Sequence, residues 1–480
     1  NLGNLKELNL SWSETLKELP DLSKARNLEV LDLGGCSMLR NVHQSIFSLP
    51  KLEKLDLGKC GSLSRLASDC KLCSLCYLNL DYCKNLTEFS LISDNMKELG
   101  LRYTKVKALP STFGCQSKLK WLHLKGSAIE RLPASINKLT QLLHLEVSRC
   151  RKLQTIAELP MFLETLDVYF CPSLQTLQEL PSSLKILNVK DCKSLETLTE
   201  LPLSLETLNV KECKSLQTLP KLPPLLKTLY VRKCTSLQTL PELPCSLKTL
   251  YAIYCTSLKT VLFPSTAVEQ LKENKARVLF LNCLKLDEHS LEAIGLNAQS
   301  NVMKFANQHR STPNHDHVQN YNNYDYGDNH NSYQAVYLYP GSSVPKWMEY
   351  KTTKDYINID LPSAPSSPLL SFIFCFVLDK YGDDTALIER FYVNITVNDG
   401  EGERKKDGVS MHIGYLDSII ESDHVCVMYD QRCSDFLNSR AKNQTRLRIE
   451  VSMRVRIFYN ETYKPLPRVL KGFGVSLISS

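Results

Sequence analysis

The apolar residues in the first 283 positions recur in one short pattern. In Leu205–Val210 (LETLNV), aliphatic residues stand at the first, fourth and sixth positions, and polar residues fill the others. The alternation in the last three positions predicts a short strand with two side chains in a core and one in solvent. We therefore expect Leu208 and Val210 to face inward and Asn209 to face outward.

The pattern belongs to a longer unit, L-x-x-L-x-L-x-x-C, that is repeated along the chain. Its last position falls every 21 to 24 residues, at Ser13, Cys36, Cys60, Cys83, Thr104, Ser127, Cys150, Cys171, Cys192, Cys213, Cys234 and Cys255, and a weaker unit ends at Cys283. Template and period are those of leucine-rich repeats, whose units bury their apolar edges only by stacking. Residues 1–285 are thus predicted to form an α/β leucine-rich-repeat solenoid, a horseshoe with a parallel sheet on its concave side.

The 18 cysteines are explained largely by this repeat. A small side chain with a weak S–H donor suits the buried turn where each unit leaves its strand. Thr104 and Ser127 fill the same slot, which argues against a ladder of disulfides. Cys70, Cys73 and Cys76 have C-x-x-C spacing without a second pair, so we expect no metal there. Unpaired cysteines in this number favour a reducing compartment, which is the cytoplasm or also the nucleus.

The outward strand residues are the candidate binding surface. Two outward columns change character along the chain, from acidic or neutral early units to later units rich in tyrosine, lysine and arginine. Tyrosine and arginine are enriched at interface hot spots, so we expect the concave face to bind a protein. The predicted contact residues are His123, Lys125, Glu146, Asp167, Tyr169, Lys190, Lys211, Tyr230, Arg232, Tyr251 and Ile253. The acidic residues in the same columns argue against nucleic acid as the ligand.

The pattern changes after Cys283. An amphipathic helix is predicted from Asp287 to about Gln308, where it would cap the solenoid, and a polar linker that we expect to be disordered completes the segment 286–334. Residues 335–480 are predicted to form an all-β antiparallel sandwich with little helix. Its expected strands are 337–339, 357–361, 370–378, 391–397, 411–416, 424–429, 445–459 and 474–478. In the longest strand, Arg446, Arg448, Arg454 and Arg456 are expected on one solvent-facing side.

Composition and motifs argue against chemistry in this chain. The net charge of +7 is mild, and no run of 18 apolar residues is present. No P-loop, G-x-S-x-G or H-E-x-x-H motif occurs, so we predict no catalytic residue and no cofactor. The irregularly spaced histidines His309, His315, His317 and His330 are expected to be solvated. Because the first residues already lie inside the repeat pattern, we interpret the chain as part of a longer protein.

Several stretches resemble one family. The sequence C-x-S-L-x-T-L-x-x-L-P-x-x-L-x-x-L-x-V occurs four times from Cys171 on, the last copy ending in Ala252. It resembles the late repeats of plant intracellular immune receptors of the Toll/interleukin-receptor, nucleotide-binding, leucine-rich-repeat (TIR-NBS-LRR) class. VLFLNCLKLDEHSLEAI (278–294) is similar to the segment that closes their repeats. YPGSSVPKWMEY (339–350), with INIDLP (357–362), is similar to the start of their post-repeat jelly-roll and immunoglobulin-like domain (C-JID), and Gly341, Val344, Pro345 and Trp347 match its motif.

The resemblance implies the sensor half of a disease resistance receptor in innate immunity. In that family, the repeats and the C-JID recognise a pathogen effector, and a nucleotide-binding module that holds ADP or ATP then assembles tetramers. Signal transduction ends in a hypersensitive response, with NAD hydrolysis by the N-terminal module; neither module lies in these residues. Two alternatives stay open: a substrate-recognition scaffold of a ubiquitin ligase or another adaptor, and a secreted receptor ectodomain.

Overall fold

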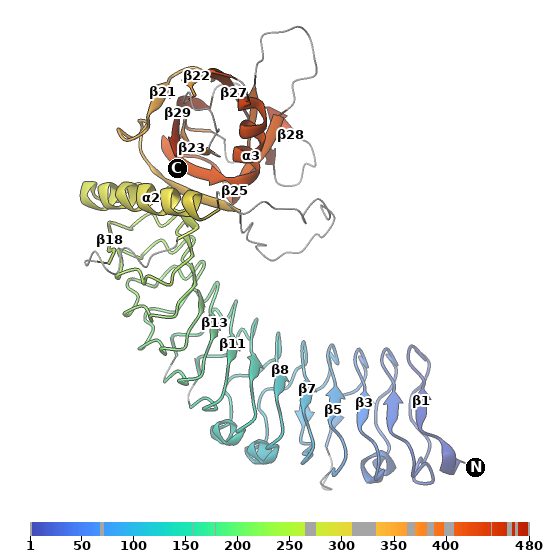
Figure 1. The fold of residues 1–480 in the computed structure, drawn as a ribbon. Coiled ribbons are helices and arrows are strands. Elements are labelled where there is room, and N and C mark those ends of the chain that lie inside the picture. Colours follow the sequence, from blue (N-terminus) through green and yellow to red (C-terminus); the bar gives the residue numbers. More distant parts are fainter. Residues whose placement is uncertain are drawn as a thin grey trace. The chain divides into compact units, whose positions relative to one another are not determined.

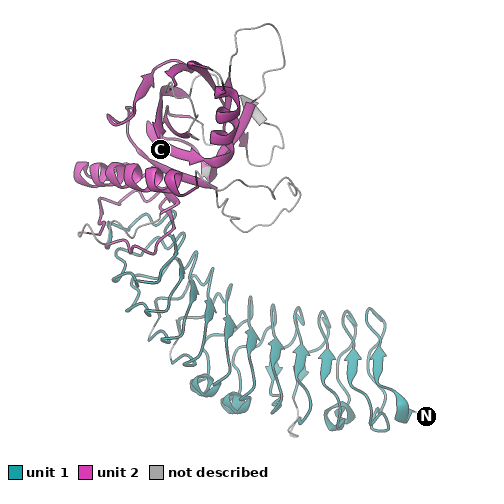
Figure 2. Ribbon diagram, in the orientation of Figure 1, with its two compact units in different colours: residues 1–241 teal, residues 242–480 magenta. Residues whose placement is uncertain are grey.

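A computed structural model describes residues 2–67, 72–156, 158–177, 179–264, 275–309, 333–361, 370–381, 388–397, 408–442, 444–457, 463–465 and 469–478. The chain divides into two compact units, residues 1–241 and 242–480 (Figure 2). The sequence pattern predicts that the solenoid ends at residue 285. The boundary between the two compact units lies earlier, at residue 241, so the last repeats belong to the same unit as the C-terminal strands. The domain boundaries drawn from the sequence stay a prediction.

Unit 1 is a stack of short parallel strands, each contributed by one repeat (Figure 1). Neighbouring strands pair in strict register, so that Leu8, Leu31 and Leu55 occupy equivalent positions. The strands are β1 (Glu7–Asn9), β2 (Val30–Asp32), β3 (Lys54–Asp56), β5 (Tyr77–Asn79), β7 (Glu98–Gly100), β8 (Trp121–His123), β9 (His144–Glu146), β11 (Thr165–Asp167), β13 (Ile186–Asn188), β14 (Thr207–Asn209) and β15 (Thr228–Tyr230). The leucine-rich-repeat fold predicted from the period is confirmed.

The outer side of unit 1 carries smaller elements that the sequence pattern did not predict. Two-residue strands pair in parallel, β4 (Arg65–Leu66) with β6 (Glu88–Phe89) and β10 (Thr155–Ile156) with β12 (Thr176–Leu177); a further short strand is β16 (Thr239–Leu240). The 3-10 helices are η1 (Leu2–Asn4), η2 (Gln44–Ser48), η3 (Ser111–Cys115) and η4 (Ala134–Lys138). Such one-turn elements are too short for a hydrophobic period to reveal them.

The cysteines form the buried corner that the repeat predicts. The Cys213 thiol is fully buried and donates to the Val189 carbonyl of the preceding repeat at 3.1 Å, and Cys192 donates in the same way to Val168 at 3.2 Å. In Leu208–Val210 the two aliphatic side chains are buried and Asn209 is not. All described cysteines are free thiols; Cys70 lies outside the described residues.

The residue just before each cysteine position adopts a left-handed backbone with positive φ. We call these residues the turn column: Trp12, Gly35, Lys59, Tyr82, Tyr103, Gly126, Arg149, Phe170, Asp191, Glu212, Lys233, Tyr254 and Asn282. Non-glycine residues rarely adopt this conformation, and here the hydrogen bonds of the repeated turn impose it. The turn, and not the alternation along the strand, sets the direction of the side chains of the non-glycine residues in this column.

Unit 2 joins the last repeats to a β-sandwich through one sheet. Strand β19 (Arg277–Leu279) pairs in parallel with β17 (Thr249–Tyr251) on one side and with β20 (Gln334–Pro340) on the other. Antiparallel pairing continues from β20 through β26 (His424–Asp430), β23 (Ser371–Leu378) and β29 (Leu470–Ile478) to β21 (Tyr350–Thr352). The short strand β18 (Thr260–Val261) also belongs to this unit.

The second sheet of the sandwich contains β22 (Tyr356–Asp360), β27 (Arg446–Ile457), β24 (Ile388–Val397) and β25 (Gly408–Ser418), and β28 (Tyr463–Pro465) pairs with β27. The eight predicted strands and the predicted helix, α2 (Glu288–His309), are confirmed. The alternation in β27 buries its aliphatic residues and leaves the four arginines on the solvent side, as expected. Helix α3 (Gln431–Ala441), capped by Asp430, was not predicted.

Candidate functional site

The outward face of the unit 1 sheet brings the predicted residues into continuous rows. Strand register places His123 beside Glu146 and Glu146 beside Asp167, at the ends of β8, β9 and β11. Lys125 and Tyr169 follow two residues after His123 and Asp167 in the second row. Because the strands are parallel and in register, residues from successive repeats lie about 4.8 Å apart and form one surface.

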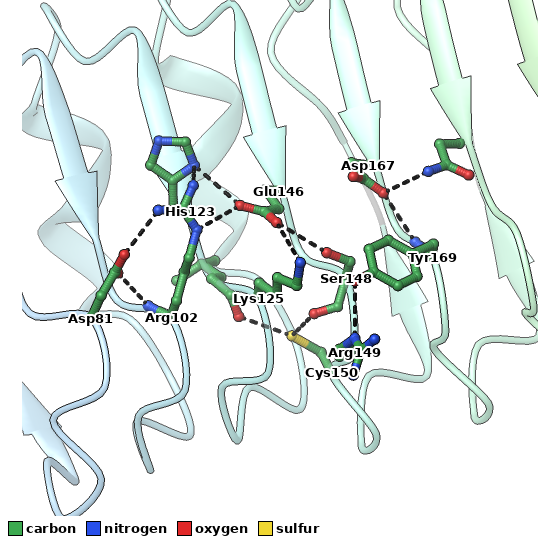
Figure 3. A network of polar contacts seen from close by, with 12 residues as sticks. Asp81, Arg102, His123, Lys125, Glu146, Ser148, Arg149, Cys150, Asp167 and Tyr169 are labelled. Carbon is green, nitrogen blue, oxygen red and sulfur yellow. Dashed lines mark hydrogen bonds and ion pairs between the residues drawn. The ribbon is translucent and has the colours of Figure 1, made fainter. Parts of the chain in front are cut away.

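Arg102 and Glu146 form the centre of a charge network on this face (Figure 3). The Arg102 guanidinium lies 2.8 Å from Glu146 Oε2 and 2.8 Å from Asp81 Oδ2. Burial alone would raise the pKa of Glu146, but hydrogen bonds from His123 and Arg102 lower it to about 2. Glu146 is therefore ionised, and the network holds its side chains in one arrangement.

The His123 ring is oriented by this network. His123 Nδ1 lies 2.8 Å from Arg102 Nη2 and 3.3 Å from Glu146 Oε2. Its other ring nitrogen, Nε2, faces Glu98 Oε1 at 3.6 Å. Arg102 and Asp81 were not among the predicted contact residues, although Arg102 stands in the same outward row as Lys125.

Aromatic and cationic side chains continue the surface towards later repeats. Lys125 lies 5.1 Å from the centre of the Tyr169 ring, and Arg149 Nε donates to Tyr169 Oη at 2.9 Å (Figure 3). Lys125 also approaches Glu146 Oε1 at 3.8 Å. These contacts fix an amphipathic aromatic residue between two cations, an arrangement suited to a protein interface.

Three other predicted residues lie further along the rows. Burial raises the pKa of Asp167, whose Oδ1 accepts hydrogen bonds from Asn188 at 3.1 Å and from the Tyr169 amide at 3.3 Å. Lys190 and Lys211 are half-buried, and Lys211 lies 3.7 Å from Glu212. The structure thus joins His123, Lys125, Glu146 and Tyr169 in one cluster and places Asp167 and the lysines beside it.

The expectation that the last predicted residues are open to a partner is corrected. The exposed fractions of Arg232, Tyr251 and Ile253 are 7%, 7% and 1%. In unit 2 the β-sandwich lies against the strand next to Tyr251: Arg277 Nη1 donates to the Ile413 carbonyl at 2.8 Å, and a side chain at Gly414 would contact Arg277. Buried side chains are not available for recognition; Tyr230 is half-buried and stays in the candidate face.

The last repeat and the sandwich are joined by Asn282. Its Nδ2 donates to the Ile419 carbonyl at 2.8 Å, and its Oδ1 accepts from the Glu421 amide at 3.0 Å. Its own amide donates to His424 Nε2 at 2.9 Å, while His424 Nδ1 lies 2.8 Å from the Ser422 carbonyl. Burial lowers the pKa of His424 to about 4, so the ring is neutral. No sequence pattern pointed to this pair.

The matched motif at the start of the sandwich is structural. Gly341 donates its amide to the Asp423 carbonyl at 3.1 Å, and an added Cβ would lie 2.9 Å from Val425. Val344 packs against Gly472 and Gly474 of β29. The Pro345 carbonyl accepts from Met348, and Trp347 is half-buried.

The described residues contain no group of three or more His, Cys, Asp or Glu side chains that could hold a metal. His315, His317 and His330 lie outside them. None of the described helices combines the length and apolar character needed to cross a bilayer.

Comparison with known proteins agrees with this architecture. Residues 339–478 match the C-JID domain family. Relatives include Disease resistance protein RML1A of Arabidopsis thaliana (35% identity over 34% of this chain and 14% of RML1A) and TMV resistance protein N of Nicotiana glutinosa (33% over 33% and 14%). Disease resistance protein RPP4 of Arabidopsis thaliana is 48% identical over 19% of this chain and 8% of RPP4. The matched stretches cover only a small part of these relatives.

Two solved leucine-rich-repeat structures resemble part of the chain. A leucine-rich-repeat protein of Leptospira interrogans covers 62% of this chain and 95% of its own length at 20% identity, with a TM-score of 0.31. The leucine-rich repeat domain of the type III effector XopL covers 47% and 75% at 21% identity, with a TM-score of 0.32. We draw nothing about function from these two structures.

Proposed function

Because the chain is similar to the repeat and C-JID region of plant TIR-NBS-LRR disease resistance proteins, we propose that it is the ligand-sensing region of an intracellular immune receptor. It binds a pathogen effector protein on the unit 1 face and in this way triggers defence signalling and cell death. Its role is recognition rather than catalysis, and the ADP- or ATP-binding and NAD-hydrolysing modules belong to the rest of the receptor. The receptor acts in the cytoplasm, and in the nucleus as well, and assembles as a tetramer.

The observation that carries this proposal is the pre-organised face around Glu146. The side chains of Arg102, Lys125 and Glu146 are 31%, 26% and 18% exposed, so they are accessible but held by one another. When a partner protein binds, these side chains lose little conformational entropy, because they are already ordered, and the loss of this entropy is a major cost of association. Lys125 and Tyr169 supply the cationic and aromatic contacts that dominate interface energies.

Binding alone does not switch a receptor. The effector has to bind the active arrangement of the receptor more tightly than the resting one, since a ligand shifts an equilibrium only by its differential affinity. A rigid face serves this purpose because it transmits the position of the bound effector to neighbouring modules instead of adapting to it.

The test uses the complete receptor that contains this chain, expressed in leaves with a panel of candidate effectors. The double variant Tyr169→Ala/Lys190→Glu should abolish cell death with the matching effector. The control variant is Lys118→Glu, because Lys118 is exposed and bonded only to Asn95 Oδ1 at 2.6 Å among the described contacts. Equal responses from both variants, at equal protein level, would overturn the assignment of the face.

A further inference from the structure

The turn column of unit 1 forms a row of stacked side chains along one edge of the repeats. The Tyr82 and Tyr103 rings are stacked at 4.8 Å with an interplanar angle of 19°. Further along, the Arg149 guanidinium lies 5.8 Å from the centre of the Phe170 ring. The row is distinct from the concave face, since its side chains leave the turns and not the strands.

Gly126 interrupts this row. Its φ is +67°, and an added Cβ would lie 2.5 Å from the Tyr103 ring, so only glycine fits. With no side chain at this position, a hollow of about 360 Å³ is left between Tyr103 on one side and Arg149 and Phe170 on the other. That volume lies within the range of small-molecule sites.

The chemistry of the hollow is aromatic and cationic. Arg149, Arg151 and Lys152 line it together with the Tyr103 and Phe170 rings, and its lining contains no acidic side chain. Lys152 pairs with Glu130 at 3.3 Å, but both side chains are at least half exposed, so the pair is exchanged at little cost. A second hollow of about 330 Å³ shares Arg151 and Lys152, and its lining adds both Arg131 and the acidic Glu130.

From this arrangement we infer a ligand site for a planar anion, a phosphate monoester carried on an aromatic or heteroaromatic ring. The ring enters the hollow between Tyr103, whose own ring lies over Gly126, and the Arg149 guanidinium. The phosphate reaches Arg151 and Lys152. Neither the repeat pattern nor the proposed effector face requires this site, and the inference does not rest on the proposed function.

The ring is essential to the argument. Exposed lysines and arginines are well hydrated, so a free phosphate gains little from them. Stacking and cation–π contacts add about 1–3 kcal/mol for a base or ring placed between such groups. The site should therefore separate a ring phosphate from inorganic phosphate, and a nucleotide and a phosphotyrosine-like group share the necessary chemistry.

The experiment is isothermal titration of the 480-residue chain with AMP, phenyl phosphate and inorganic phosphate at low salt. At least one ring phosphate should bind about tenfold more tightly than inorganic phosphate. Preference for AMP assigns the site to nucleotides, and preference for phenyl phosphate assigns it to aryl phosphates such as phosphotyrosine. Equal affinity for all three compounds, or no binding of any, overturns the inference.

Matched variants locate the site. Arg151→Gln and Lys152→Gln should each weaken binding of the preferred ring phosphate about tenfold. Lys214→Gln, at the position equivalent to Arg151 in another repeat, should leave binding unchanged. Tyr103→Leu should reduce affinity to that of inorganic phosphate, and Trp12→Leu in the same row should not. Because the cation variants are at exposed positions, they leave the core intact. If the Arg151→Gln and Lys214→Gln proteins bind alike, the ligand is elsewhere and the inference fails.

Discussion

Replacing Asn282 tests whether the β-sandwich is held to the last repeat by one side chain. Asn282 is fully buried, and its side chain makes two short hydrogen bonds, to the Ile419 carbonyl and from the Glu421 amide. In Asn282→Ala both partners lose their bond in a partly buried place, which costs about 1–2 kcal/mol each. The backbone φ of +57° adds about 1 kcal/mol, because alanine tolerates it less well than asparagine. The expected loss of stability is about 4 kcal/mol.

Native-state hydrogen exchange measures this loss where it occurs. A chain of two compact units need not unfold in a single transition, so a global midpoint would mix their responses. Protection of the β26 amides should fall about a thousandfold in Asn282→Ala, since each 1.4 kcal/mol corresponds to a factor of ten. Protection of β3 and β5 in unit 1 should stay unchanged.

Two further variants separate the causes. Asn282→Gly removes the same hydrogen bonds without the backbone penalty, so it should be about 1 kcal/mol less damaging than Asn282→Ala. Lys233→Ala, at another left-handed turn, should leave β26 protected. If β26 is equally protected in wild type and Asn282→Ala, Asn282 does not hold the two parts together and the reasoning is wrong.

Three other outcomes are expected. The pKa of His424 in the folded protein, about 4, lies below the ordinary 6.5, so between these values the unfolded chain takes up a proton that the folded protein does not. The opening free energy of the β26 amides should therefore fall by up to about 3 kcal/mol as the pH drops from 6.5 to 4. An opening free energy that does not change over this range would contradict the prediction. Glu146→Gln removes one of the two carboxylates that pair with Arg102 and leaves Asp81, and it should lower the local stability of β9, measured by exchange, by about 2 kcal/mol, whereas an unchanged β9 would refute the network. Burial raises the pKa of Cys213, so iodoacetamide should label exposed Cys73 and not Cys213 in the folded protein, as read by mass spectrometry; labelling of Cys213 would disprove the buried ladder.

The sequence predicted the repeats and the strands because their signals are periodic. Leu208, Asn209 and Val210 alternate, and the same alternation recurs in every unit, so a local pattern sufficed. The strand β27 was recognised in the same way, from aliphatic residues alternating with arginines. Helix α3 was missed because only Cys433 and Leu437 mark its buried side, and its start depends on Asp430 accepting from the Cys433 amide at 3.1 Å.

The candidate residues of the earlier repeats are accessible, as the strand pattern predicts, whereas those of the last repeats are buried. This difference has a physical reason. A strand pattern states which side chains leave the core, but not whether another segment covers them. Tyr251 and Ile253 stand at outward positions of the strand pattern and are nevertheless buried, and in the next strand of the same sheet Arg277 and Leu279 lie against Gly414 of β25. Contacts between residues more than a hundred positions apart carry no periodic signal.

The turn column shows a second limit of strand-based analysis, with a consequence for where recognition can occur. Alternation sorts residues into inward and outward classes, yet Tyr103 and Arg149 belong to neither, because a left-handed turn points them along the edge of the repeats. Side chains there are free to vary, since the backbone bonds of the turn and not the side chain hold the conformation; Gly126 is an exception forced by the Tyr103 ring. A repeat protein of this kind therefore offers two rows of variable residues, one on the sheet and one on the edge, and here the two rows meet where Arg149 Nε donates to Tyr169 Oη.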